Sequence, residues 1–433
     1  MTAPIHRIEV LIVGATQLAM IIGTFLALKL FTNLLPISEY GLLSLGLAII
    51  TGFQMVYSAM SNALLRYLPI ARAQNDLRGY RKGLQGLVRL SLGVPVALVI
   101  LLGLVLLLFG EPVLPLYVLA VIVACAAGLA SWAQTILLAL RKRGQVLGLT
   151  VITYILRPVV AVIAMLSFGF SADVVLWAFV VVQLLTLPMA QILTRRALDG
   201  LPEDQSGPTA KDPVDDYRAT FIRYGVYFLA AGVLVALILQ GDRWLIKSNL
   251  GLAELGLYGA ILTIASVTTN LVFSFMSQLM TPVIFQKFGS SHGDAREGKQ
   301  AYRTYILLSA GIFFVALALI TMLREPVILL LTDRTFLAAA ALLPILTAAQ
   351  AIEKMGQSVT LRGLAALRTW PYLWARLIQL LVLLGGGYYG VMTNGIVGVA
   401  YAQLAACACY FLVTWSTNWV LLDMPRRDAG AKG

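Results

Sequence analysis

Six charged side chains interrupt apolar stretches of the chain, and their types could carry chemistry. They are five cations, Lys29, Arg66, Arg157, Arg243 and Lys247, together with one acid, Asp242. An ionisable group at the centre of a membrane helix costs about 2.5–3.5 kcal/mol on insertion scales, so it normally faces a protein interior or a wet cavity. Groups of this kind bind charge, carry an ion or form a structural pair.

Arg157 lies near the middle of an apolar segment and precedes Pro158, which opens the backbone there. We favour a functional role over a structural pair beneath the proline. Asp242 and Arg243 follow a Gln-Gly pair, and Lys247 lies one helical turn beyond Arg243. This group is either a site of ion coupling or an ion pair close to a membrane interface, where side chains can snorkel.

Two other cations have simpler alternatives. Lys29 lies late in its segment, where its stem could reach the outer headgroups. Arg66 is one of many arginines at inner segment ends, so topology alone could account for it. We also expect Glu353, Lys354 and Arg376 to form a charge group at the membrane interface.

No enzyme is indicated. The sequence has no phosphate-binding glycine loop, metal-ligand cluster or nucleophile elbow. Its three cysteines lie in apolar segments and predict neither a disulfide framework nor a metal site. We therefore predict no catalytic residue, no metal and no cofactor. A membrane glycosyltransferase, ligase or polymerase would need a sizeable outer loop for its acceptor, and every expected outer connection is short.

The composition is that of a membrane protein. Hydrophobic residues make up 60% of the chain and charged residues 12%, against about a quarter charged in soluble proteins. A spanning helix needs about 20 mostly apolar residues. Breaks at charged and Pro/Gly clusters give twelve spans, at roughly 10–34, 40–64, 85–109, 113–139, 147–168, 173–194, 219–248, 254–284, 302–323, 335–360, 370–389 and 393–421.

A short loop occurs twice. Leu35–Leu42 and Leu250–Leu257 place Leu, Glu, Gly and Leu in identical register, 215 residues apart (250 − 35). Glu111-Pro112-Val113 recurs as Glu325-Pro326-Val327 at 214 residues (325 − 111). A repeat at about half the chain length predicts a duplicated unit. Glu39 and Glu254 lie in this loop, where each would offset the dipole of the helix that follows it.

The twelve spans divide into six and six at a polar, Pro- and Gly-containing stretch. We predict an N-terminal six-helix lobe at 1–198, a cytoplasmic linker at 199–217 and a C-terminal six-helix lobe at 218–433. Since each lobe has an even number of spans, the two enter from the same side, and their pseudo-two-fold axis runs along the membrane normal. The fold class is thus an all-α polytopic membrane protein with twelve transmembrane helices in two lobes.

Orientation follows from the positive-inside bias. The even-numbered connections and both termini hold 26 of the 32 Lys and Arg residues, so both termini are predicted to be cytoplasmic. This bias and anionic headgroups account for the net charge of +12. We infer no nucleic-acid partner from it.

The whole pattern resembles a known family. Twelve spans in two halves, the string Leu35-Pro36-Ile37-Ser38-Glu39-Tyr40-Gly41, the Asp242 element and its sequel Leu250 to Gly259 are similar to Wzx-like polysaccharide flippases. These belong to the multidrug/oligosaccharidyl-lipid/polysaccharide exporter superfamily. The resemblance covers essentially the whole chain.

The resemblance implies two lobes that open alternately to each side of a bacterial inner membrane and move an undecaprenyl-diphosphate-linked oligosaccharide outward. Lys29, Arg66, Arg157 and Arg243 are the positions that match the family's substrate-binding cavity cations by location and charge. An excess of cations over Asp242 would favour an anionic cargo. The expected partners are the cargo, membrane lipids, and a polysaccharide polymerase with its chain-length machinery, around a monomeric flippase. The alternative is a cation-coupled drug exporter of the same superfamily.

Overall fold

The structure is a computed structural model that describes residues 7–73, 76–91, 114–200, 216–289, 295–365 and 370–420. These residues are almost entirely helical and include no strand. Nine of their helices are long and apolar enough to cross a membrane. The chain is therefore a multi-pass membrane protein, and the predicted all-α polytopic fold is confirmed.

The nine helices account for ten of the predicted spans, because the helix Tyr372–Asn418 covers both 370–389 and 393–421. An eleventh span, 335–360, corresponds mainly to α12 (Leu342–Ala365). Helix α12 is not among the nine, since polar side chains in its middle, such as Glu353 and Lys354, lower its hydropathy. The predicted span 85–109 lies mostly outside the described residues.

The chain forms two compact units, unit 1 at Met1–Gln240 and unit 2 at Gly241–Gly433. The division falls inside α8 (Tyr217–Leu250), the predicted seventh span. Most of the predicted linker, 201–215, lies outside the described residues, so the boundary at 199–217 stays a prediction. The same is true of the predicted symmetry axis.

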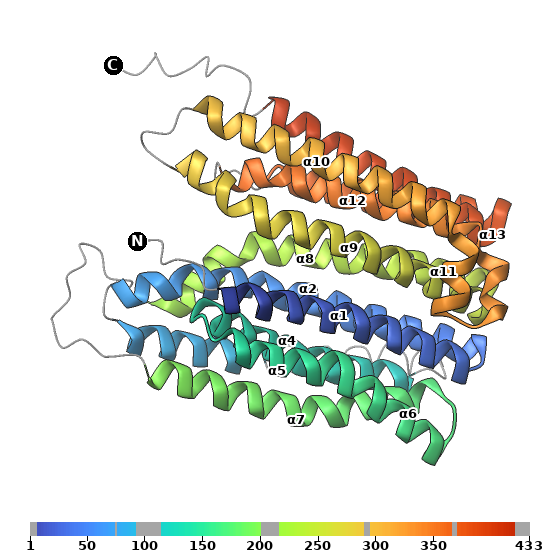
Figure 1. Cartoon of the computed structure of the whole chain (residues 1–433), viewed down its shortest axis with the longest axis horizontal. Helices are drawn as coiled ribbons and strands as arrows, with labels where there is room; N and C mark the ends of the chain where they lie inside the picture. Colours follow the sequence, from blue (N-terminus) through green and yellow to red (C-terminus); the bar gives the residue numbers. More distant parts are fainter. Residues whose placement is uncertain are drawn as a thin grey trace. The chain divides into compact units, whose positions relative to one another are not determined.

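Unit 1 is built from α1 (Arg7–Leu34), α2 (Ile37–Ala73), α4 (Leu114–Ala139), α5 (Arg143–Val151), α6 (Arg157–Phe168) and α7 (Ala172–Asp199), with residues 77–91 and the start of α8 (Figure 1). Helix α4 packs between α2 and α7, and α1 packs against α5 and the segment that follows it. Glycines allow these close approaches. Gly128 of α4 lies against the ring of Tyr57, and Gly23 of α1 lies against the backbone of Tyr154.

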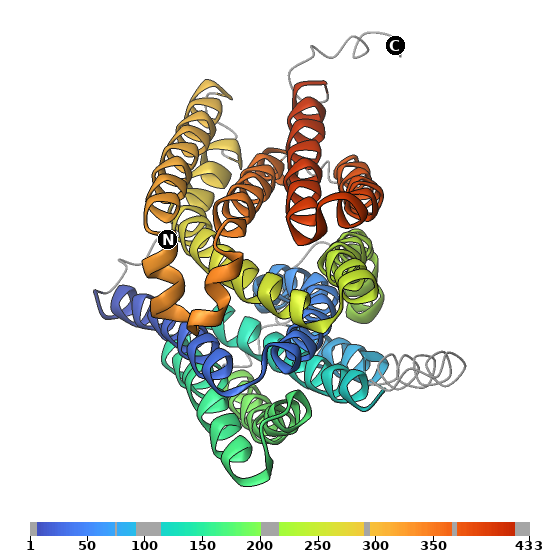
Figure 2. The ribbon, with the colours of Figure 1, turned by 90° about the vertical axis from the view of Figure 1, so that its right-hand side faces the viewer.

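Unit 2 is built around α12, which packs against α9 (Leu252–Gly289), α10 (Ala295–Met322) and α13 (Tyr372–Asn418). Helix α13 reverses at Asn394 and Gly395, where Gly395 has a φ of +58° that favours glycine. Its two arms lie side by side (Figure 2, red). Gly390 and Gly398 face each other across the arms with no room for a side chain.

The connection between α10 and α12 differs from the expected short loop. It contains α11 (Arg324–Leu331) and a 3₁₀ turn, η2 (Arg334–Ala339). Pro326 is tolerated there because it lies in the first turn of α11, where its missing N–H has no helical partner. The predicted start of a span at 335 is therefore wrong by several residues.

The repeated loop is a tight turn in both copies. Helix α1 ends at Leu34 and α2 begins at Ile37, while α8 ends at Leu250 and α9 begins at Leu252. Glu39 lies in the first turn of its own helix, as predicted, and it makes a further contact. Its Oε2 accepts a hydrogen bond of 2.8 Å from the backbone N–H of Ala172, so it caps the N-terminus of α7 as well as standing in the first turn of its own helix.

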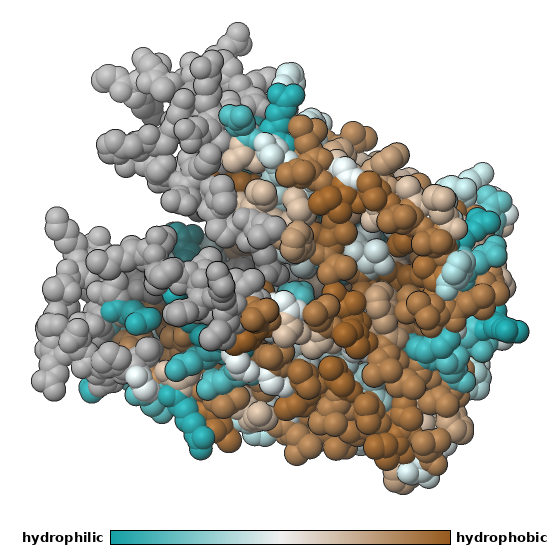
Figure 3. All heavy atoms as spheres, in the orientation of Figure 1, coloured by the Kyte–Doolittle hydropathy of each residue, from teal (hydrophilic) through white to brown (hydrophobic). Residues whose placement is uncertain are grey.

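Hydrophobic residues cover most of the face drawn in Figure 3 along the length of the helices, and hydrophilic residues gather toward the helix ends. Exposed leucine, valine and phenylalanine side chains are numerous in both units. A surface of this kind is compatible with hydrocarbon rather than with water. It agrees with the membrane assignment made from the helices.

The close approach in α13 gives a stability test. Replacing Gly398 with Ala should lower the free energy of unfolding by about 1–3 kcal/mol, because the added methyl would collide with the backbone of Gly390. The matched control is Gly385→Ala in the same helix, where an added Cβ meets no atom within 4 Å. Thermal unfolding of the detergent-purified proteins measures both. Equal unfolding temperatures for the two variants would contradict the close packing.

Candidate functional site

Arg157 begins α6 directly after a five-residue π-helix, η1 (Ile152–Leu156), so the predicted span 147–168 is one rod with an altered turn in its middle. Pro158 follows and cannot donate its backbone nitrogen. The guanidinium carbon of Arg157 lies 4.3 Å from the ring centroid of Phe179 on α7. Its Nε is buried and has no hydrogen-bond partner among the described residues.

The guanidinium of Arg157 is thus placed among apolar side chains of unit 1. The ring of Phe179 is buried and tilted against the ring of Phe31, 6.1 Å between centroids, so its position is fixed. A guanidinium over a ring face is stabilised electrostatically without losing its in-plane N–H donors. π-Helical turns are rare and occur often at functional sites. Arg157 therefore has a cation that is positioned by an aromatic ring and a buried N–H group that can donate a hydrogen bond to an anionic oxygen.

Asp242 is 1% exposed in unit 2, in the last third of α8. Its Oδ2 accepts a hydrogen bond of 2.8 Å from the hydroxyl of Tyr258 on α9. Its Oδ1 accepts from the backbone N–H of Arg243 at 2.7 Å and lies 3.6 Å from Arg243 Nη1. The carboxylate is thus buried, hydrogen-bonded and paired with the adjacent cation. Sequence reasoning did not identify Tyr258 as a partner of Asp242. The tight turn between α8 and α9 could have indicated that residues at equal distances from it lie close together.

The remaining predicted cations lie on different elements. Lys247 Nζ is 4.8 Å from the ring centroid of Trp244, its neighbour on α8. Arg66 is exposed on α2, with its guanidinium carbon 4.8 Å from the ring centroid of Tyr224 on α8. Lys29 is half-buried on α1.

The predicted residues therefore fall into two groups. Lys29, Arg66 and Arg157 belong to unit 1, and Asp242, Arg243 and Lys247 belong to unit 2. The structure places Asp242 and Arg243 in direct contact. Arg66 and Arg157 each lie against an aromatic ring of their own unit. Their assignment as substrate-binding residues stays a prediction.

The charge group predicted at the membrane interface is buried among the helices of unit 2. Glu353 on α12 is 9% exposed and Arg376 on α13 is 8% exposed. Arg376 Nη1 donates to Glu353 Oε1 at 3.2 Å and to Gln379 Oε1 at 2.7 Å, and its guanidinium carbon lies 3.8 Å from the ring centroid of Tyr410. Gln357 donates a second hydrogen bond of 3.2 Å to Glu353. Sequence reasoning missed this burial because it did not show which side of α12 faces α13.

A second cation accompanies this pair. Lys354 is half-buried, and its Nζ lies 5.6 Å from the ring centroid of Phe273 on α9. The cluster joins α9, α12 and both arms of α13 through one carboxylate, two cations and two ring faces. No group of three or more His, Cys, Asp or Glu residues in the described part of the chain could hold a metal ion. The cluster is accordingly a helix-joining ion pair.

Unit 1 also contains an apolar cavity of about 590 Å³ between α2, residues 77–91, α4 and α8. Its polar groups are occupied, since the hydroxyl of Tyr57 donates to the backbone oxygen of Ser91 at 3.2 Å and Trp132 Nε1 donates to the backbone oxygen of Tyr57 at 2.8 Å. A cavity without available polar partners stays dry and suits apolar matter. Its lining is therefore mainly apolar.

Residues 9–288, almost two thirds of the chain, match the sequence profile of a family described as "Polysaccharide biosynthesis protein". The chain belongs to this family. No curated protein sequence matches it. The predicted resemblance to polysaccharide flippases is thus confirmed at the level of the family.

Solved structures show that this member of the polysaccharide biosynthesis family has the fold of MOP superfamily transporters. An inward-facing multidrug resistance MATE family transporter aligns with a TM-score of 0.73 at 12% identity, covering 94% of this chain and 97% of its own. The lipid II flippase MurJ, in an inward closed conformation, aligns with a TM-score of 0.66 at 12% identity, covering 95% and 87%. The MATE transporter VcmN from Vibrio cholerae gives 0.63 at 14% identity, covering 95% of each chain.

The buried ion pair gives a second stability test. Arg376→Met should destabilise unit 2 by about 3–5 kcal/mol, because it leaves the carboxylate of Glu353 buried without its paired cation. Combining Arg376→Met with Glu353→Met removes both charges and should recover most of the loss. Arg334→Met, at an exposed arginine of η2, is the control. Thermal unfolding decides, and a double variant no more stable than Arg376→Met would exclude the pair as the cause.

Proposed function

We propose that this protein is a flippase that moves an undecaprenyl-diphosphate-linked oligosaccharide from the inner to the outer leaflet of a bacterial inner membrane. It works by alternating access, supplies surface polysaccharide biosynthesis and makes or breaks no covalent bond in its cargo. Membership of the polysaccharide biosynthesis family supports the pathway. The fold shared with the lipid II flippase MurJ supports transport of a lipid-linked glycan.

The observation that carries the proposal is Arg157. A diphosphate crossing hydrocarbon loses its water, at a cost far above that of a neutral polar group, unless cations and donors replace the water. A guanidinium matches phosphate oxygens with a fork of parallel N–H donors. Arg157 offers a cation seated on Phe179 and a buried Nε whose hydrogen is not used by the described residues.

The other cations extend this role. Lys29, Arg66 and Arg243 would meet the diphosphate or acidic sugars at other stages of transport, while the polyprenyl chain stays in lipid. Asp242, bonded to Tyr258 and Arg243, would couple transport to an ion gradient. Both termini would be cytoplasmic. The working protein would be a monomer among membrane lipids that hands cargo to a polysaccharide polymerase and its chain-length machinery.

Arg157→Ala should abolish surface polysaccharide in a strain that depends on this gene, with unchanged protein level, because the diphosphate loses its buried cation. Arg157→Lys should restore only part, since an ammonium does not reproduce the planar fork. Polymer is quantified on the cell surface and protein by immunoblot. Arg324→Ala, at an exposed arginine of α11, is the control. Full polymer from Arg157→Ala would remove this residue from the mechanism.

A second candidate is a cation-coupled exporter of small drugs. The MATE transporters that share the fold include proteins described as multidrug resistance transporters, and Asp242 is a buried acid of the type that such coupling needs. Among the predicted cavity residues, four cations, Lys29, Arg66, Arg157 and Arg243, stand against this one acid. This balance favours the flippase.

Deletion of the gene separates the two candidates. A flippase predicts lipid-linked oligosaccharide accumulating in the inner leaflet, because its headgroup cannot cross unaided. Leaflet position is measured by accessibility of the glycan to an impermeant glycosidase in intact spheroplasts. Cargo that still reaches the outer leaflet, with a change in drug susceptibility, would select the exporter.

A further inference from the structure

A continuous set of aromatic rings runs through unit 1 where α2, residues 77–91 and α8 meet. Its base is buried and consists of Tyr80, Tyr217 and Phe221. The ring of Tyr80 lies 5.9 Å from that of Tyr217 and 5.4 Å from that of Phe221, each edge-on. The hydroxyl of Tyr80 donates to the backbone oxygen of Leu64 at 3.1 Å, which ties the base to α2.

The rings continue from this base to a half-buried layer of Tyr67, Tyr224, Tyr227 and Phe228. Tyr67 lies 6.0 Å from Phe221 and 5.9 Å from Tyr224, and Phe228 lies 5.6 Å from Tyr224 and 5.1 Å from Tyr227. Each of these rings thus packs against at least one other ring of the set. We call these four residues the aromatic platform.

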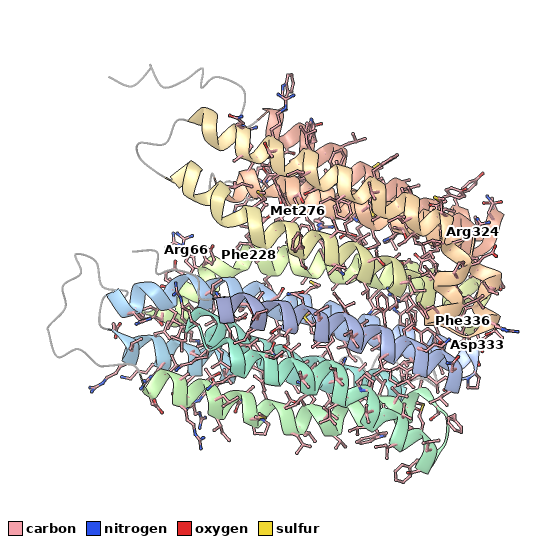
Figure 4. All side chains as sticks on the ribbon, in the orientation of Figure 1. Arg66, Phe228, Met276, Arg324, Asp333 and Phe336 are labelled. Carbon is pink, nitrogen blue, oxygen red and sulfur yellow. The ribbon has the colours of Figure 1, made fainter. Side chains whose placement is uncertain are left out.

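Arg66 stands at the edge of the platform. It is exposed, and its guanidinium carbon lies 4.8 Å from the ring centroid of Tyr224. Figure 4 shows Arg66 and Phe228 near one another, at the end of α2 and in the first half of α8. By the predicted orientation this end is cytoplasmic. The arrangement therefore presents an accessible cation beside half-buried aromatic rings.

We propose that the aromatic platform, with Arg66, is a binding site for the sugar units of the lipid-linked cargo at its cytoplasmic entry. The inference rests on the proposed flippase function and adds the part of the cargo that is recognised. Aromatic ring faces carry partial negative charge, so they attract the polarised C–H groups on the face of a sugar ring. Arg66 supplies hydrogen bonds and charge for phosphate oxygens at the reducing end.

A lipid-facing aromatic belt is the other source of aromatic residues at this depth. The positions on α8 argue against it. At this level an exposed apolar side chain on another side of α8 is Val226, 41% exposed, which is aliphatic. The side toward α2 carries Gly225 and Gly232, which lie against Met60 and the backbone of Met55. The rings occupy a third side, next to the cation.

The test uses two matched double variants in the deletion strain. Tyr224→Leu with Phe228→Leu keeps apolar bulk and removes both ring faces. Tyr224→Phe with Phe228→Tyr exchanges the residues and keeps the rings. We expect the leucine pair to slow delivery of cargo to the outer leaflet about tenfold, which corresponds to the loss of about 1.4 kcal/mol of aromatic contact. The exchanged pair should stay near wild type.

Binding by the purified protein in nanodiscs separates sugar recognition from folding. The probes are farnesyl diphospho-N-acetylglucosamine and farnesyl diphosphate. The wild type should bind the sugar-bearing probe more tightly, and the leucine pair should bind both probes equally, at the affinity the wild type shows for farnesyl diphosphate. Arg66→Gln should weaken both. Tyr388→Leu with Tyr389→Leu, at exposed rings of α13, should change neither.

The outcomes distinguish the two proposals. Wild-type delivery or an unchanged preference for the sugar-bearing probe in the leucine pair overturns the platform and leaves the flippase standing. The same holds if the wild type binds both probes equally. Normal outer-leaflet cargo in the deletion strain overturns the flippase itself. Loss of sugar preference with retained binding of farnesyl diphosphate supports the platform, because a misfolded protein would lose both.

Discussion

The structure depends on one constraint, that a charge removed from water must find compensation within its own helical unit. Each unit meets this constraint differently. In unit 2, Arg376 is paired with Glu353, hydrogen-bonded to Gln379 and covered by the ring of Tyr410. In unit 1, Arg157 lies against the ring of Phe179, and its buried Nε has no hydrogen-bond partner among the described residues. The first arrangement is electrostatically closed and joins helices. The second is open, and an anion would complete it.

This asymmetry organises the functional interpretation. A closed cluster gains little from a ligand, because its carboxylate and guanidinium are already paired, whereas a buried cation without a paired anion is costly until a ligand binds. Asp242 lies between these cases, since Tyr258 and Arg243 compensate it with groups that can also exchange partners. Cargo binding is therefore best sought in unit 1 and ion coupling at α8 and α9. The pocket of unit 1 is lined mainly by apolar side chains.

Much of the fold was predictable, because membrane helices are recognised from their length and hydropathy. Eleven of the twelve predicted spans correspond to described helices. The burial of Glu353 and Arg376 was not, since it depends on which faces of α12 and α13 meet. The hydrogen bond that the backbone N–H of Ala172 donates to Glu39 was not predictable either, because it joins residues 133 positions apart. Arg157 was recognised from the sequence only because placing a charged side chain in the middle of a membrane helix costs free energy. Its partner Phe179, like the partner Tyr258 of Asp242, is an ordinary helix residue that only the packing distinguishes.

The π-helical turn at Ile152–Leu156 has a consequence for comparing this chain with its relatives. Such a turn holds one residue more than an α-helical turn, and one residue corresponds to about 100° of rotation about the axis. A relative with an unbroken helix at this point would need a one-residue gap in the alignment. Without that gap, an arginine placed opposite Arg157 would point about a quarter-turn away. Two arginines at the same alignment position would then point in different directions. The residue of the relative that is structurally equivalent to Arg157 would lie one position away in the alignment.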